Sequence, residues 1–163
     1  PVIFVTIGSM FPFDRLIRGM DAWAAERGER DVLAQIGDGT YLPRHMRHVR
    51  RLSQADFTAS VANADVVIAH AGMGTVITAG RLGRPLVLLP RIEAWGEHTT
   101  DHQIATANWL RGKPGVFVAD TDTDLNEAIH AARGAGGAAG RLSPVADPAF
   151  TDRLRAAILD FLE

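Results

Sequence analysis

DVVIAHAGMGT, residues 65–75, joins an apolar, β-branched run to a histidine, two glycines and a threonine. The run 66–69 is typical of a short strand that is buried on both faces, as in a parallel sheet. The segment 75–82 that follows predicts a helix. Gly72 and Gly74 lie between the two, where the chain has to turn tightly. We therefore expect a strand, a glycine turn and a helix, which together form one unit of an α/β fold.

The same alternation continues along the chain in both directions. Short apolar runs predict strands at 2–7, 32–36, 66–69, 86–89 and 116–119. Amphipathic stretches predict helices at 14–27, 57–64, 75–82, 101–110 and 122–132, the first of them capped by Asp14. We expect loops at 40–51 and 91–100. This pattern predicts the α/β class, with a single doubly wound, Rossmann-like parallel sheet covered on both faces.

The chain has 163 residues, a formal net charge of -2 and no cysteine. Without cysteine there is no disulfide, thiolate zinc site or thiol nucleophile, and the balanced charge gives no signature of nucleic-acid binding. No apolar stretch approaches the ~18–20 residues of a membrane span, and no basic leader precedes the first strand, so we expect a cytoplasmic protein. We divide the chain into an α/β domain at 1–133, a flexible Gly/Ala/Pro-containing linker at 134–149 and an amphipathic helix at 150–163, which packs on the domain or on a partner.

The glycine turn has the features of a diphosphate site. Ligands of doubly wound sheets bind beyond the carboxyl ends of the strands, and a helix N-terminus offers unpaired N–H groups to an anion. Gly72 and Gly74 leave the backbone open to approach, while His70 and Thr75 can donate further hydrogen bonds. The residues alone leave a second interpretation open, in which His70 only satisfies backbone groups within a tight turn. Neither a Walker motif nor G-x-G-x-x-G is present.

Four stretches together resemble a known enzyme family. The run 64–103, ADVVIAHAGMGTVITAGRLGRPLVLLPRIEAWGEHTTDHQ, is similar to the donor-binding, C-terminal half of GT-B glycosyltransferases, which include the bacterial transferase that makes lipid II. VTIGSMFPFDRLI (5–17), QIGDGT (35–40) and WGEHTTDHQ (95–103) match other loops of that half. The likeness is stronger to the small soluble subunits of two-subunit UDP-sugar transferases, which act in bacterial exopolysaccharide and capsule synthesis and in N-glycan assembly. It covers roughly residues 2–110.

The resemblance implies roles for particular residues. The donor diphosphate would be bound by residues of the first and third predicted strand ends, namely Gly8, Ser9, His70, Gly72, Gly74 and Thr75. The loop at 91–103 would supply contacts to the sugar or the partner, or help to close the site, through Arg91, Glu97, Asp101 and Gln103. Relatives often carry a glutamate that grips the ribose hydroxyls where this chain has Thr78. Thr78 can make one such hydrogen bond but not a bidentate carboxylate contact.

The function that the resemblance implies is transfer of a sugar from a UDP-sugar to a lipid-linked acceptor, with inversion. This chain would be the donor-binding subunit, recruited to the inner face of the membrane by a membrane-associated, acceptor-binding subunit that carries the catalytic base. It would need no metal or other cofactor, and isolated chains could self-associate. Two alternatives remain: a non-catalytic scaffold or activator subunit with a degenerate donor site, which Thr78 favours, and an unrelated nucleotide-binding α/β protein.

Three other features carry weaker hypotheses. Glu97-His98-x-x-Asp101-His102 could hold a zinc ion if both histidines shared a helix face. The basic stretch 44–51 is either a solvated loop or a patch for an acidic partner or an anionic membrane. Tyr41 and Trp95 could stack on a base or sugar, or pack at an interface.

Overall fold

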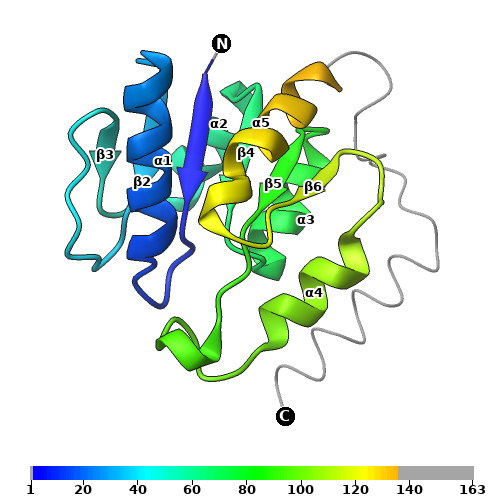
Figure 1. The fold of residues 1–163 in the computed structure, drawn as a ribbon. Coiled ribbons are helices and arrows are strands. Elements are labelled where there is room, and N and C mark those ends of the chain that lie inside the picture. The colour runs from blue at the N-terminus through cyan, green and yellow to red at the C-terminus, as the bar shows by residue number, and fades with distance from the viewer. Residues whose placement is uncertain (1, 136–163) are drawn as a thin grey trace.

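The computed structural model describes residues 2–135, which form a parallel sheet with helices on both faces (Figure 1). The strands are β1 (Ile3–Thr6), β2 (Val32–Gln35), β3 (Arg47–Val49), β4 (Val66–Ala69), β5 (Leu86–Leu88) and β6 (Val116–Val118). The helices are α1 (Asp14–Arg27), α2 (Gln54–Asn63), α3 (Met73–Arg81), α4 (His102–Leu110) and α5 (Leu125–Gly134), with 3₁₀ turns η1 (Glu93–Trp95) and η2 (Asp122–Asp124). Of the predicted linker at 134–149, Gly134 is the last residue of α5 and Ala135 its C-cap. The rest of the linker and the predicted last helix lie outside the described residues.

The sheet has the strand order β3-β2-β1-β4-β5-β6, with every neighbouring pair parallel. This order confirms the predicted doubly wound class. The chain winds one way from β1 and the other way from β4, and these two strands are direct neighbours, with Thr6 opposite Ala69. The loops that leave them therefore diverge, which opens a crevice at their carboxyl ends. Gly8 and His70 both lie at this switch point.

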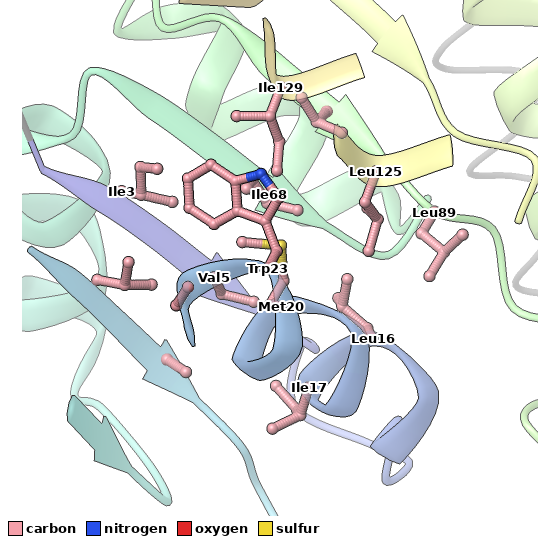
Figure 2. Packing of buried hydrophobic residues seen from close by; sticks show 14 of the residues in the cluster. Ile3, Val5, Leu16, Ile17, Met20, Trp23, Ile68, Leu89, Leu125 and Ile129 are labelled. Carbon is pink, nitrogen blue, oxygen red and sulfur yellow. The ribbon is translucent and has the colours of Figure 1, made fainter. Parts of the chain in front are cut away.

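Two apolar layers enclose the sheet. On one face, α1 and α5 pack over strand residues such as Ile3 and Val5, and Trp23 lies at the centre of this layer (Figure 2). On the other face, α2, α3 and α4 cover Phe4 and its neighbours. Alternate residues of each strand thus enter opposite cores, as the continuous apolar runs predicted. Among residues 2–135, no helix combines the length and the apolar character that crossing a membrane requires.

The prediction of a loop throughout 40–51 is wrong, because β3 occupies three residues of it and pairs with β2. The strand is short and lies at the edge of the sheet, and Arg47 and His48 are exposed. Charged side chains on an edge strand prevent pairing with another sheet. They also remove the apolar pattern by which the other strands were recognised.

Four helix starts differ from the prediction, those of α2, α3 (Met73), α4 (His102) and α5 (Leu125), and the cap of α1 differs as well. Helix α2 begins at Gln54 rather than at 57, because the Ser53 hydroxyl accepts a hydrogen bond from Asp56 N and so caps the helix N-terminus. Helix α1 begins at Asp14 as its first residue, so the predicted Asp14 cap is not formed. The Asp14 carboxylate instead accepts a hydrogen bond from the Thr40 hydroxyl at 2.8 Å.

The loop before β3 is anchored by a buried carboxylate. Asp21 of α1 is 2% exposed. It accepts hydrogen bonds from Tyr41 Oη at 2.7 Å, His45 N at 2.7 Å and Arg44 N at 3.1 Å. Burial raises the pKa of Asp21, but these hydrogen bonds outweigh it and leave the pKa below the usual value. Tyr41 is thus part of the contact between α1 and this loop.

Replacing Asp21 with alanine should lower the free energy of unfolding by about 3 kcal/mol, because two backbone N–H groups lose a charged acceptor. Tyr41→Phe, which removes only one of the donors, should lower it by about 1 kcal/mol. Urea unfolding at pH 7 measures both. Equal effects of the two substitutions would show that the carboxylate does not anchor the loop.

Candidate donor site at the switch point

The His70 ring lies between two glycines at the end of β4. A Cβ atom on Gly8 would lie 2.5 Å from His70 Nε2, and one on Gly72 would overlap Cε1 of the same ring. Gly8 also has a φ of 77°, which favours glycine. The structure therefore brings together three of the predicted site residues, from the loops after β1 and β4. Ser9, next to Gly8, is exposed.

Gln35, at the end of β2, fixes the Gly8 turn and was not among the predicted site residues. Its side-chain amide donates to Gly8 O at 3.0 Å and accepts from the Thr6 hydroxyl at 2.5 Å. Gly8 N in turn donates to Thr6 Oγ1 at 3.2 Å. A buried glutamine at the end of an otherwise apolar strand, as in QIGDGT, is the signal that could have identified it.

Gln103, from the first turn of α4, connects the loops after β4 and β5. It is 7% exposed. Its side-chain oxygen accepts hydrogen bonds from Ala71 N and Arg91 N, both at 3.1 Å, and its side-chain nitrogen lies 3.1 Å from His70 Nδ1. The predicted contact of Gln103 with a sugar stays a prediction, whereas its contacts within the fold place it directly behind His70.

His70 is neutral at physiological pH. Burial lowers its pKa to about 3, and the nearby charges of Arg91 and His98 add to this effect. His98, from the β5–α4 loop, packs its ring edge-on against Phe11 of the β1–α1 loop, at 5.4 Å between centroids. Burial, Arg91 and His102 likewise lower the pKa of His98. The site therefore offers uncharged imidazole groups rather than imidazolium ions.

The N-terminus of α3 is open. Gly72 occupies the N-cap position and no side chain caps the helix, so the N–H groups of the first turn are directed out of the helix end. A Cβ on Gly74 would meet nothing within 4 Å. Thr75 is 4% exposed and belongs to this first turn. The Thr78 hydroxyl donates to Gly74 O at 2.9 Å, so its proton is already used within the helix.

Arg91 is a scaffold residue. Its side chain is 2% exposed, and its guanidinium group donates to the carbonyl oxygens of Ile7, Phe11, Pro12 and Glu97 at 2.6 to 3.1 Å. Burial lowers the pKa of Arg91 to about 10, so the group stays charged at neutral pH. Its N–H groups hold the loops after β1 and β5 together, and the predicted contact with a sugar or partner stays a prediction.

The two predicted carboxylates of the β5–α4 loop form contacts within the fold. Glu97 binds Arg15 through both oxygens, at 2.9 and 3.0 Å, and accepts from Ile92 N at 2.9 Å. Asp101 is exposed and accepts from Glu93 N at 2.9 Å. It lies at the N-cap of α4 without a side-chain cap. Within residues 2–135, no three His, Asp or Glu side chains gather in a way that could hold a metal ion.

Arg91→Met should lower the free energy of unfolding by about 3 kcal/mol or more, because it leaves four carbonyl oxygens without their charged donor. Arg111→Met is the matched control, since Arg111 pairs with Asp120 on an exposed surface and should contribute less than about 1 kcal/mol. Chemical unfolding of both variants tests this. A loss below 1 kcal/mol for Arg91→Met would contradict the scaffold role.

Acid should destabilise the fold through His70. The unfolded side chain has a pKa of 6.5 and the folded one about 3, so below pH 6.5 only the unfolded state takes up the proton, and this contribution to stability is lost as the pH falls toward 3. Between pH 6.5 and 4.5 the loss should be roughly 2 kcal/mol, allowing for the partly solvated ring edge. His70→Phe should flatten this slope in urea titrations, whereas replacing the exposed His130 with glutamine should not. Equal slopes in all three proteins would refute the assignment.

Comparison with known proteins identifies the family of this chain. The model of the glycosyltransferase family 28 C-terminal domain matches residues 2–133. Similar solved structures include MurG of Acinetobacter baumannii (TM-score 0.63, 20% identity, 98% of this chain and 50% of that one) and ALG13 (0.62, 18%, 94% and 94%). A third is SsfS6 of Streptomyces sp. SF2575, solved with thymidine diphosphate (0.55, 17%, 99% and 37%).

The chain thus spans half of MurG and little more than a third of SsfS6, but nearly all of ALG13. At these identities the structures show the fold alone. The family model covers most of the sequence, including both loops that form the switch point. This chain belongs to the glycosyltransferase family 28 C-terminal domain family.

Proposed function

We propose that this chain is the donor-binding subunit of a two-component inverting glycosyltransferase, which transfers a sugar from a UDP-sugar to a lipid-linked acceptor. The observation that carries the proposal is the uncapped N-terminus of α3, which faces open space above Gly74 beside the neutral ring of His70. A diphosphate fits this arrangement because it accepts hydrogen bonds from backbone N–H groups. The thymidine diphosphate in SsfS6 supports a nucleoside diphosphate as the ligand class.

The proposed site would assist the reaction by stabilising negative charge on the leaving group. When the bond between sugar and diphosphate breaks, negative charge grows on the departing nucleoside diphosphate. The α3 N-terminus and a ring N–H of His70 would stabilise that charge more strongly in the transition state than in the bound donor. The buried charge of Arg91 adds a favourable field without giving up its hydrogen bonds.

The acceptor and the base are proposed to belong to a membrane-associated partner subunit. Of the acidic residues predicted for the site, Glu97 is paired with Arg15, and Asp101 accepts a backbone N–H. The ion pair therefore occupies Glu97, and one oxygen of Asp101 is committed to the loop. The match to almost the whole of ALG13 supports a two-component arrangement, because a polypeptide of similar extent is found there as a separate chain.

A non-catalytic scaffold subunit is the second candidate, and Thr78 favours it. No carboxylate is available there for the ribose hydroxyls, and the Thr78 hydroxyl is already bonded to Gly74 O. Such a subunit would activate a partner transferase without binding a donor of its own.

Thermal unfolding of the chain with UDP, UDP-GlcNAc, UDP-glucuronate, UDP-galactose, ADP and NAD separates these functions. A ligand at 100 times its Kd stabilises the native state by about 2.7 kcal/mol, which raises the Tm by several degrees. A uridine-selective rise supports the donor subunit, and the sugar that gives the largest rise indicates the donor. Absence of any rise, alone and with the partner subunit, supports the scaffold. An adenine-selective rise would indicate an unrelated nucleotide-binding role.

Gly74→Ala should weaken UDP binding at least tenfold without destabilising the fold. The added methyl group points into the open space where the diphosphate is proposed to lie, and alanine stabilises a helix by about 0.4–1 kcal/mol relative to glycine. Gly134→Ala is the matched control, since a Cβ there also meets nothing within 4 Å. Calorimetric titration with UDP and thermal unfolding measure both effects. Unchanged UDP affinity in Gly74→Ala would place the ligand elsewhere.

A further inference from the structure

The hydrogen bonds around Gln103 determine which way its side-chain amide faces. Two backbone N–H groups, those of Ala71 and Arg91, point at one end of this amide, each at 3.1 Å. Only the carbonyl oxygen can accept both, because the NH2 end would place donor against donor. The amide NH2 group must therefore be the end that faces His70.

This orientation determines which nitrogen of His70 carries the proton. The amide nitrogen of Gln103 lies 3.1 Å from His70 Nδ1, and since the amide donates, Nδ1 must accept. A proton on Nδ1 would place the ring N–H donor against the N–H donor of the Gln103 amide. In the neutral ring, the proton is then on Nε2. The same amide also disfavours the imidazolium form, in the same direction as burial and Arg91.

The two ring nitrogens cannot readily exchange their roles, Nδ1 as acceptor and Nε2 as donor. It occupies the slot between Gly8 and Gly72, where even one added methyl group would overlap it. Turning the ring over would place a C–H group against the Gln103 amide and leave Nδ1 without its donor. Among residues 2–135, no group accepts a hydrogen bond from Nε2, so this N–H remains available to a ligand at the switch point.

We propose that Gln103 is a positioning residue that holds His70 as the Nε2–H tautomer, a permanent hydrogen-bond donor rather than a base. The tautomer itself follows from the contacts above, and its use in binding a diphosphate rests on the proposed function. In this role Gln103 acts on the diphosphate through His70. A Gln103 that contacted sugar hydroxyls would affect binding of UDP-sugars but not of UDP, so the two roles can be distinguished.

Long-range ¹H–¹⁵N NMR spectra of the whole chain, labelled with ¹⁵N-histidine, test the tautomer directly, with His70→Phe assigning the signals. His70 should show a protonated Nε2 and a lone-pair Nδ1 at every pH from 8 to 5. A protonated Nδ1, a mixture of tautomers, or imidazolium at pH 6 would overturn the proposal. This test needs neither a ligand nor a partner.

Gln103→Glu tests the cause. One carboxylate oxygen can still accept from Ala71 N and Arg91 N, while the other would face Nδ1 and draw the proton to it. We expect the Nδ1–H or imidazolium pattern in this variant. Gln35→Glu, which also places a carboxylate under the site but has no contact with His70, should keep the wild-type pattern. If Gln103→Glu kept it as well, the proposal would fail.

Calorimetric binding of UDP and UDP-GlcNAc tests the consequence. At pH 8, where the His70 ring of Gln103→Glu is expected to be neutral and protonated on Nδ1, this variant should weaken both by the same factor, about tenfold, because each ligand loses the same hydrogen bond from Nε2. Weakening of UDP-GlcNAc alone would assign Gln103 to the sugar and overturn the positioning role in binding. If the wild-type chain bound neither nucleotide, alone or with the partner subunit, the proposed function would fail, while the NMR spectra would still decide the tautomer.

Discussion

The buried guanidinium of Arg91 is the interaction on which the site depends. It connects the carbonyl oxygens of Ile7, Phe11 and Pro12, after β1, to that of Glu97, after β5. An unpaired charge at this depth would cost several kcal/mol. Four oxygens, the ring of Phe13 at 4.7 Å and the attraction of the Glu97 carboxylate offset that cost. Arg91 therefore holds the two loops in one arrangement. This arrangement sets the shape of the region where β1 and β4 end.

Around that charge, the contacts that fix Gly8 and His70 are made by neutral groups. Gln35 fixes the Gly8 turn from one side, and Gln103 fixes His70 from the other. A side-chain amide can donate and accept at once, so each glutamine joins two segments without adding a charge to the crevice. Arg91 and the N-terminus of α3 both contribute a positive field there, and the charge of the nearby Glu97 is balanced by Arg15. This arrangement favours an anion over a cation or a neutral sugar alone.

Local sequence patterns predicted the fold and the turn but not the contacts that hold the turn in place. Five strands were recognisable because each is a buried apolar run, and β3 was missed because an edge strand with exposed Arg47 lacks that run. His70 and Gly72 could be assigned to the site because they follow a strand directly. The scaffold role of Arg91 joins residues 79 to 84 positions apart in the sequence, and no local periodicity encodes such a contact.

Thr78 determines where the binding energy of a nucleotide donor can come from. Its hydroxyl proton is donated to Gly74 O, so toward ribose hydroxyls it can offer only the lone pairs of one hydroxyl oxygen and no carboxylate. The α3 N-terminus and Nε2 of His70 would contact features that every nucleoside diphosphate shares. Discrimination between bases, if this chain binds a donor, must then come from other surfaces, on this chain or on a partner. On the proposed function, the site would hold the diphosphate and leave the choice of nucleoside and sugar to its surroundings.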